Sequence, residues 1–220
     1  MIKLSKRLEA ISSLIPNNSK VIDIGCDHGF LDIYLYQHQI CIKVIASDIN
    51  KNALNNAKYN IKKYQLEEKI DVRLGNGLDI LMENDDIDTV IISGMGAHTI
   101  IGILKDNLSK LKKINTIVIQ SNNKLEFLRK EMSRINYLIE DELLVEDNKK
   151  IYTIIKFIKG KKKYNKKELY FGPILLKKNT ELFQLNNQKE LKKLKLLLRV
   201  LPKKRIIDRY NIKKKISMYK

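Results

Sequence analysis

The sequence predicts an α/β protein: a Rossmann-like, doubly wound sheet followed by a small basic helical appendage. Three observations support this fold class. Short β-branched runs alternate with helical segments from residue 21 to residue 158. Several predicted strands end in loops that contain glycine or aspartate, as the ligand-binding loops of such sheets do. Basic residues are concentrated in residues 156–220.

The first predicted strand and the turn after it, residues 21–31, are the most informative segment. The apolar run ends in Asp23-Ile24-Gly25, and Gly29 follows before a helix. The absence of a Cβ at Gly25 and Gly29 lets a ligand approach the backbone amides of this turn. A dinucleotide fingerprint has glycine where this chain has Asp27, whose carboxylate repels a pyrophosphate and attracts the cationic S-adenosylmethionine (SAM). The turn therefore predicts a SAM site.

The second strand, residues 44–48, ends in Asp48 about 19 residues after Gly29. In this fold class an acid at the end of the second strand accepts hydrogen bonds from both ribose hydroxyls. The alternative is a strand with a chance terminal aspartate.

The remaining elements keep the same alternation. Asn50 is a good N-cap for a helix over 51–63. Further strands are expected at 70–74, 89–93 and 116–120, helices at 97–108 and 125–135, and a closing pair of strands at 137–145 and 151–158. Ligands bind at the carboxyl ends of such strands, so four loops are expected to converge on one crevice.

The expected cofactor-binding residues come from these four loops. They are Asp23, Gly25, Asp27, His28, Leu31, Asp48, Ile49, Gly75, Asn76, Gly77, Gly94 and Met95. Two of them have structural alternatives: a histidine in the first turn of a helix is often a packing or capping group, and Met95 could fill the core.

Charge divides the chain. Residues 1–155 hold 21 basic and 21 acidic residues, whereas residues 156–220 hold 22 and 4, so the whole net charge of +18 lies in the last segment. A polyanion is the expected partner, because such lysine runs neutralise phosphates and release their counterions. Lysine enrichment from an AT-rich genome is the alternative, but it would raise lysine throughout the chain. The expected contacts are Lys161, Lys162, Lys163, Lys203, Lys204, Arg205, Lys213, Lys214 and Lys215.

The basic segment has a helical pattern. Leu191, Leu194, Leu198 and Leu201 recur at 3-4-3 spacing, and Pro202 then interrupts the pattern. Ile206, Tyr210 and Lys213 continue it, which predicts a second, antiparallel helix. We expect a SAM-binding domain over residues 1–160 and a basic helical domain over 161–220.

Composition narrows the remaining possibilities. The two cysteines show no metal-binding spacing, so no metal is expected. The charged N-terminus does not resemble a signal peptide or a membrane span. A cytoplasmic monomer without membrane contact is expected.

Several short motifs resemble the bacterial TrmK family of tRNA adenine-N1 methyltransferases. In order along the chain they are Leu4-Ser5-Lys6-Arg7-Leu8, Asp23-Ile24-Gly25-Cys26-Asp27-His28, Gly75-Asn76-Gly77-Leu78, Gly94-Met95-Gly96, Gln120-Ser121-Asn122 and Gly172-Pro173. The resemblance implies a class I SAM-dependent fold with a coiled-coil-like tail, tRNA as partner, and methylation of N1 of adenine 22. The chain departs from the family at Ser121, where proline is common, and in its short tail.

The expected catalytic residues are Asp27 and Asn122. Methyl transfer from a sulfonium is an in-line displacement that depends mainly on orientation. Methylation of N1 makes adenine cationic, so the Asp27 carboxylate could stabilise that charge or take a proton from the exocyclic amine; its alternative role is cofactor binding or helix capping. Asn122 could bind the target base, or cap its own loop. Ser93-Gly94-Met95-Gly96 differs from the Asn/Asp-Pro-Pro-aromatic loop typical of enzymes that methylate the amine.

Two other functions remain open at this point. A small-molecule methyltransferase would explain the four loops and leave the basic segment without a role. A catalytically silent RNA-binding module would explain the basic segment and leave the loops without one.

Overall fold

The structure is a computed structural model that describes residues 1–219. The chain divides into two compact units, Met1–Ile174 and Leu175–Lys220. The first unit extends past the boundary expected at residues 160 and 161, because helix α6 (Lys166–Phe171) packs on helix α5 (Leu125–Arg134). No helix among the described residues is long and apolar enough to cross a membrane.

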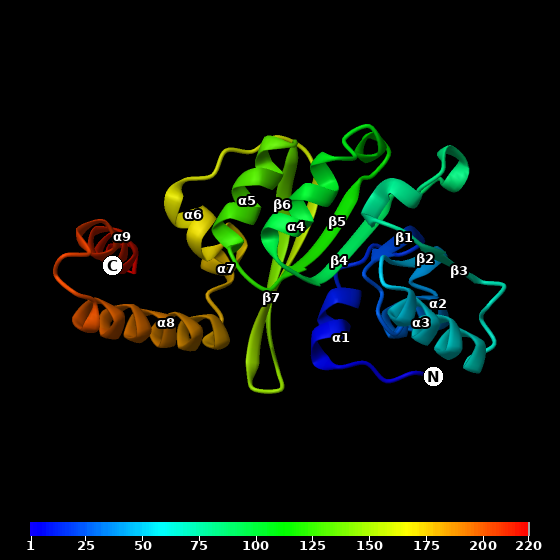
Figure 1. The fold of residues 1–220 in the computed structure, drawn as a ribbon, viewed down its shortest axis with the longest axis horizontal. Helices are drawn as coiled ribbons and strands as arrows, with labels where there is room; N and C mark the ends of the chain where they lie inside the picture. Colours follow the sequence, from blue (N-terminus) through cyan, green and yellow to red (C-terminus); the bar gives the residue numbers. More distant parts are fainter. Residues whose placement is uncertain (220) are drawn as a thin grey trace. The chain divides into compact units, whose positions relative to one another are not determined.

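A seven-stranded sheet in the order β3-β2-β1-β4-β5-β7-β6 forms the first unit (Figure 1). Strand β7 runs antiparallel to both of its neighbours, β5 and β6, and the other neighbouring pairs are parallel. The strands are β1 (Ser19–Ile24), β2 (Cys41–Asp48), β3 (Ile70–Leu74), β4 (Thr89–Met95), β5 (Thr116–Ser121), β6 (Tyr137–Asp147) and β7 (Lys150–Lys159). Strands β2 and β4 lie on opposite sides of β1, so the strand order reverses at this point. Sheets of this kind bind ligands where the order reverses.

Helices cover both faces of the sheet. One face packs against α1 (Lys6–Ser12), α2 (Phe30–Gln37) and α3 (Lys51–Lys63), and the other against α4 (Ala97–Lys105) and α5. Successive residues of a strand point to opposite faces of the sheet. Val21 packs in the core on the side of α1, α2 and α3, and Ile22 packs in the core on the side of α4 and α5. The short 3-10 helices are η1 (Gly77–Ile80), η2 (Glu83–Asp85) and η3 (Lys110–Lys112).

The predicted doubly wound sheet with a closing antiparallel hairpin is confirmed. The helix expected over 51–63 and the strand over 70–74 have the predicted bounds, whereas α4 ends at Lys105 and not at 108. Helix α1 was not among the expected elements. It begins after Ser5, whose hydroxyl accepts a hydrogen bond from the backbone N–H of Leu8 (3.4 Å).

Helix α6 was also not predicted, although its first turn has a capping box. Asn165 Oδ1 accepts from the backbone N–H of Glu168 (2.9 Å), and Glu168 Oε2 accepts from that of Asn165 (2.7 Å). The Asn-x-x-Glu spacing is a known helix-start pattern and could have indicated this helix.

A fully buried ion pair holds the end of α6 on the first unit. Arg129 Nε donates to Glu142 Oε1 (2.7 Å), and the two side chains are 1% and 0% exposed. Arg129 Nη1 also donates to the carbonyl oxygens of Leu169 (2.9 Å) and Tyr170 (3.2 Å). A Cβ at Gly172 (φ +95°) would lie 2.5 Å from Glu142 Oε2, so only glycine fits at this position beside the ion pair.

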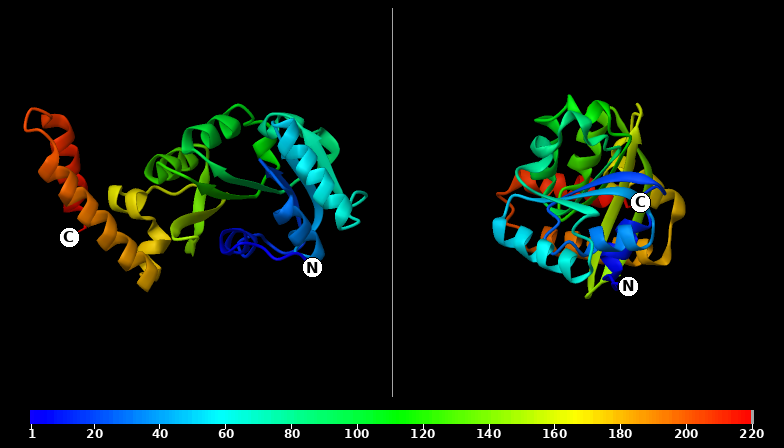
Figure 2. Two further views of the ribbon diagram at one scale, coloured as in Figure 1. Left: turned by 60° about the horizontal axis from the view of Figure 1, so that its bottom comes forward. Right: turned by 90° about the vertical axis from the view of Figure 1, so that its right-hand side faces the viewer.

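The second unit contains the two predicted helices, α8 (Glu181–Val200) and α9 (Ile206–Ser217), and α7 (Pro173–Lys178) leads into it. Figure 2 shows α9 turned back alongside α8, as expected of an antiparallel pair. Arg209 Nη1 donates to the carbonyl oxygens of Leu198 (2.9 Å) and Leu201 (2.6 Å), which otherwise lack intrahelical partners at this helix end.

The predicted contact face is correct on α8 and wrong on α9. Leu191, Leu194, Leu198 and Leu201 are half-buried, as their spacing indicates. On α9, however, Ile206 and Tyr210 are 73% and 64% exposed, and Ile212 is the buried residue. The prediction carried the α8 pattern across Pro202, but the turn after this proline resets the helical phase.

We predict that Glu142→Gln destabilises the protein by roughly 3–5 kcal/mol, because it leaves the Arg129 charge buried without its counter-ion. Glu140→Gln on the same strand is the control: Glu140 pairs with Lys156 (2.7 Å) with 41% of its side chain exposed, and surface pairs contribute about 0–1 kcal/mol. Urea unfolding measures both. Equal effects of the two substitutions would contradict a structural role for the buried pair.

Candidate active site

A crevice of about 470 Å³ lies at the carboxyl ends of β1, β2 and β4. Eight of the expected cofactor-binding residues line it: Asp23, Gly25, Asp27, His28, Leu31, Asp48, Gly94 and Met95. The remaining lining residues are Arg7, Leu8, Cys26, Phe30 and Ser93. Three of the four expected loops therefore meet in one place.

The turn after β1 is tied to the neighbouring strand. The backbone N–H groups of Gly25 and Cys26 both donate to the carbonyl oxygen of Ser47 (2.8 and 2.9 Å). Gly25, Asp27 and Gly29 all have left-handed backbone conformations, with φ of +79°, +52° and +69°. Asp27 thus keeps the conformation that glycine favours at this position of a dinucleotide turn, but adds a carboxylate.

Glycine at position 25 is favoured mainly by its left-handed backbone, and the flexible side chain of Met95, the last residue of β4, lies close to it. A Cβ there would lie 2.5 Å from Cε of Met95, and the φ of +79° is itself unfavourable for other residues. Met95 therefore packs directly over the turn.

Asp48 is held at the rim of the crevice by two backbone groups. Its Oδ2 accepts from the N–H of Asp27 (3.3 Å), and its Oδ1 accepts from the N–H of Asn50 (2.8 Å). Each oxygen retains a further lone pair for a ligand hydroxyl. The same carboxylate thus supports the turn and presents acceptors to the crevice.

Asp23 is a buried acid without a full set of partners. It is 3% exposed, and its Oδ1 accepts no hydrogen bond from the described residues. The pKa of Asp23 is raised to about 7, mainly by burial and also by the nearby Asp48 charge, while Arg7 opposes both. Asp32, fully buried in α2, has a pKa well above its usual range because of burial and of Asp23. Such a pair favours a cation in the crevice.

Asp27 and His28 form the exposed lip of the crevice. Oδ2 of Asp27 lies 3.6 Å from Nε2 of His28, whose ring stacks on Phe30 with 5.5 Å between centroids. Helix α2 begins at Phe30 with Gly29 as its N-cap, and no side chain among residues 1–219 caps it. The geometry therefore gives Asp27 no capping role and leaves its carboxylate to the crevice.

Five expected residues do not line the crevice: Ile49, Gly75, Asn76, Gly77 and Asn122. The backbone N–H of Gly75 donates to the carbonyl oxygen of Asp48 (3.0 Å), which brings the loop after β3 to the same edge. Nδ2 of Asn122 donates to the carbonyl oxygen of Gly94 (2.6 Å). Both loops support residues that do line the crevice.

Arg7 is the main functional candidate that the site prediction missed. It reaches the crevice from α1, and its Nη1 donates to Oε1 of Gln120 (2.9 Å), a residue far away in the sequence. The only indication in the sequence was its place in the Leu-Ser-Lys-Arg-Leu string. No local spacing connects this helix to the other loops.

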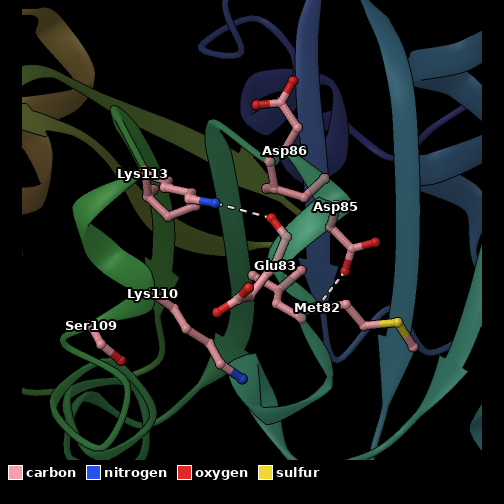
Figure 3. A pocket seen from close by; sticks show the side chains of 10 residues that line it. Met82, Glu83, Asp85, Asp86, Ser109, Lys110 and Lys113 are labelled. Atoms are coloured by element: carbon pink, nitrogen blue, oxygen red, sulfur yellow. Dashed lines mark hydrogen bonds between the residues drawn. The ribbon is translucent and has the colours of Figure 1, made fainter.

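A second pocket of about 260 Å³ lies at the amino ends of the strands, between the segments that precede β4 and β5 (Figure 3). Its lysines bond the protein itself: Lys113 Nζ donates to the carbonyl oxygen of Glu83 (3.0 Å), and Lys110 Nζ to those of Leu78 and Asp79 (2.7 Å each). Among the described residues, none of the expected site residues lines this pocket. The expected chemistry belongs to the crevice.

The described residues contain no cluster of three or more His, Cys, Asp or Glu side chains that could hold a metal ion. The two cysteines are free and buried, and burial raises the pKa of Cys41 to about 12.

The crevice suits a cationic nucleoside. Its lining holds three carboxylates against one guanidinium, one carboxylate oxygen is buried without a partner, and a left-handed turn presents backbone amides. SAM combines the ammonium, sulfonium and ribose groups that these features would bind. Together with the sheet order, they define a class I SAM-dependent methyltransferase fold.

Comparison with known proteins narrows the class further. The model of the TrmK family, described as tRNA (adenine(22)-N(1))-methyltransferase, matches residues 21–220. This chain therefore belongs to the TrmK family. The tRNA (adenine(22)-N(1))-methyltransferase of Bacillus subtilis strain 168 is 31% identical over 154 residues, which are 70% of this chain and 64% of that enzyme. The match thus spans slightly less than two thirds of the relative.

Solved structures of two relatives share the whole fold. A Streptococcus pneumoniae protein in complex with SAM is 31% identical, with a TM-score of 0.91 over 98% of this chain and 97% of that chain. TrmK of M. capricolum, in complex with the cofactor product S-adenosyl-homocysteine, is 32% identical, with a TM-score of 0.87 over 98% of this chain and 95% of that chain. The likeness includes the helical appendage as well as the sheet.

We predict different stability effects for two substitutions of Asp27. Asp27→Gly should leave the free energy of unfolding within about 1 kcal/mol of the parent, because glycine adopts a φ of +52° without strain. Asp27→Ala should lower it by roughly 1–2 kcal/mol, since alanine is strained in this region. Urea unfolding of both variants tests this. An alanine variant as stable as the glycine variant would show that the backbone conformation imposes no constraint.

Proposed function

We propose that this chain transfers the methyl group of SAM to N1 of adenine 22 in tRNA. The observation that carries the proposal is the acid-lined crevice at the carboxyl ends of β1, β2 and β4, in a chain of the TrmK family. The names of the matched relatives support the substrate, and the SAM and S-adenosyl-homocysteine complexes of two relatives support the cofactor.

The crevice residues have distinct proposed roles in holding SAM. The unpartnered Oδ1 of Asp23 accepts from the ammonium group, and Asp48 accepts from the ribose hydroxyls. The other proposed contacts are Gly25, Asp27, His28, Leu31, Ile49, Gly75, Asn76, Gly77, Gly94 and Met95. When bound, SAM supplies an electrophilic methyl group on its sulfonium.

The protein's own catalytic contribution is orientation and charge stabilisation. The N1 lone pair of adenine is already available, so no nucleophilic side chain is needed. Asp27 stands at the lip of the crevice with an exposed carboxylate, where it stabilises the positive charge that develops on the base or accepts a proton from the amine. Asn122 is exposed, uses one N–H on Gly94, and retains a second for the base.

The basic residues are proposed to bind the tRNA backbone. All nine expected contacts are exposed: Lys161, Lys162 and Lys163 in the loop before α6, Lys203, Lys204 and Arg205 in the turn between α8 and α9, and Lys213, Lys214 and Lys215 on α9. Phosphate contacts hold the RNA without reading its sequence, and the stacked adenine must be turned out to reach the crevice. We assign catalysis to the first unit and most of the RNA affinity to the second.

The decisive experiment is mass spectrometry of nuclease fragments and of nucleosides from tRNA incubated with the protein and labelled SAM. We expect labelled 1-methyladenosine at position 22. Asp27→Asn should reduce turnover much more than affinity for tRNA, because it removes the charge and preserves the size. Asp106→Asn, in an exposed acid at the end of α4, is the matched control. Label only in a small molecule, or no label at all, would contradict the proposal.

The affinity for SAM should depend on pH through Asp23. Below about pH 7 the Asp23 carboxyl becomes protonated and no longer attracts the ammonium group. We therefore expect the Kd for SAM to rise as pH falls from about 7 to 5, approaching tenfold per unit, a range in which an α-amino group stays protonated. Calorimetry with Asp23→Asn should show weak binding with a flat profile. A His28→Gln variant should keep the slope, and loss of the slope in that variant would contradict the assignment to Asp23.

The affinity for tRNA should fall steeply with salt. Each lost phosphate contact flattens the log–log slope by ~0.7–0.9. Substituting Lys203, Lys204 and Arg205 by Gln in the full chain should therefore flatten it by about two units if all three touch phosphates, and leave SAM binding unchanged. Lys62→Gln with Lys63→Gln on α3 provides a control of similar charge in the first unit. An unchanged slope in the triple variant would exclude this turn from the RNA contact.

A further inference from the structure

Three contacts hold Arg7 of helix α1 against strands β5, β6 and β7. The backbone N–H of Arg7 donates to Oδ2 of Asp147 in β6 (3.2 Å), and its guanidinium carbon lies 5.6 Å from the ring centroid of Tyr152 in β7. Nη1 donates to Oε1 of Gln120 at the end of β5 (2.9 Å). Arg7 is thus half-buried and immobilised, with its guanidinium lining the crevice.

Gln120 connects Arg7 to the loops of the crevice. It is 1% exposed, and its Oε1 accepts from both Arg7 Nη1 and the backbone N–H of Gly94 (3.1 Å). Its Nε2 donates to Oδ1 of Asn122 (3.0 Å). A flipped Gln120 amide would place its NH₂ group against two donors, so Arg7 and Gly94 together select a single orientation.

That orientation determines how Asn122 is placed. Because Oδ1 of Asn122 accepts from Gln120, its Nδ2 must face the carbonyl oxygen of Gly94, to which it donates at 2.6 Å. Both backbone groups of Gly94, a residue with φ of +77°, are therefore held by the same chain of hydrogen bonds. Low exposure at Gln120 strengthens each bond of such a network.

We propose that Arg7 is a positioning residue for methyl transfer, which orients the Gln120 amide and, through it, Asn122 and the Gly94 backbone at the crevice. The inference rests on the proposed function, because it assigns Arg7 a role in the same reaction. It adds a contribution from α1, a helix outside the loops that carry the expected cofactor contacts. Arg7 acts through Gln120 and does not need to touch the reacting atoms.

The test is a double-mutant cycle in tRNA methylation with the full chain. Arg7→Met should lower kcat about tenfold or more and leave the KM values for SAM and tRNA within about threefold, because misplaced catalytic groups reduce the rate of the chemical step. Arg7→Met combined with Asn122→Ala should be no slower than Asn122→Ala alone, because both break the same chain. Lys6→Met, an exposed neighbour on α1, is the charge-matched control and should be unchanged.

Gln120→Glu provides a second test that does not depend on how well the Arg7 variant folds. Glutamate keeps the acceptor for Arg7 and Gly94 but cannot donate to Asn122, so kcat should fall as in Arg7→Met while the melting temperature is retained. Additive losses in the cycle, a raised KM for tRNA at constant kcat, or full activity of Gln120→Glu would each overturn the proposal. Absence of methylation in the parent protein would instead refute the proposed function itself.

Discussion

The crevice depends on one constraint: the carbonyl oxygen of Ser47 at the end of β2 holds two consecutive N–H groups of the turn after β1, those of Gly25 and Cys26. Ser47 Oγ also donates to the carbonyl oxygen of Asp23 (3.0 Å), so the ends of the two strands are joined on both sides. With the turn fixed in this way, the N–H of Asp27 reaches Asp48. A shift at Ser47 would displace every acid of the crevice together.

The sequence was sufficient for those parts of the fold that are set by local chemistry. Strand alternation, the Asn50 cap and the glycine loops predicted the sheet and four loops, three of which line the crevice. Contacts between distant segments were not predictable, since nothing in α1 indicates that Arg7 meets Gln120. The incorrect α9 face has a similar cause, because helical phase is lost across a turn and only packing against α8 determines it.

Burial of two acids beside the turn reduces stability and favours ligand binding. The pKa of Asp23 is about 7 in the folded protein, above its value in the unfolded chain. Between about pH 4 and 7 the folded protein therefore binds more protons at this group than the unfolded protein does. Stability contributed by this group is therefore lost as pH rises through that window. Asp32, which burial keeps protonated to higher pH, adds in the same direction. A bound cation would offset the effect, so ligand binding and folding are linked here.

The left-handed backbone at Asp27 also bears on how such a site persists through evolution. Aspartate and glycine codons differ by a single base, and glycine fits this conformation without strain. Neither the genetic code nor the folding energy therefore opposes drift from Asp27 to glycine. A lineage that no longer required the carboxylate would be expected to lose it early, while the fold survived. The presence of an acid at this position is thus a more sensitive indicator of retained activity than the integrity of the sheet.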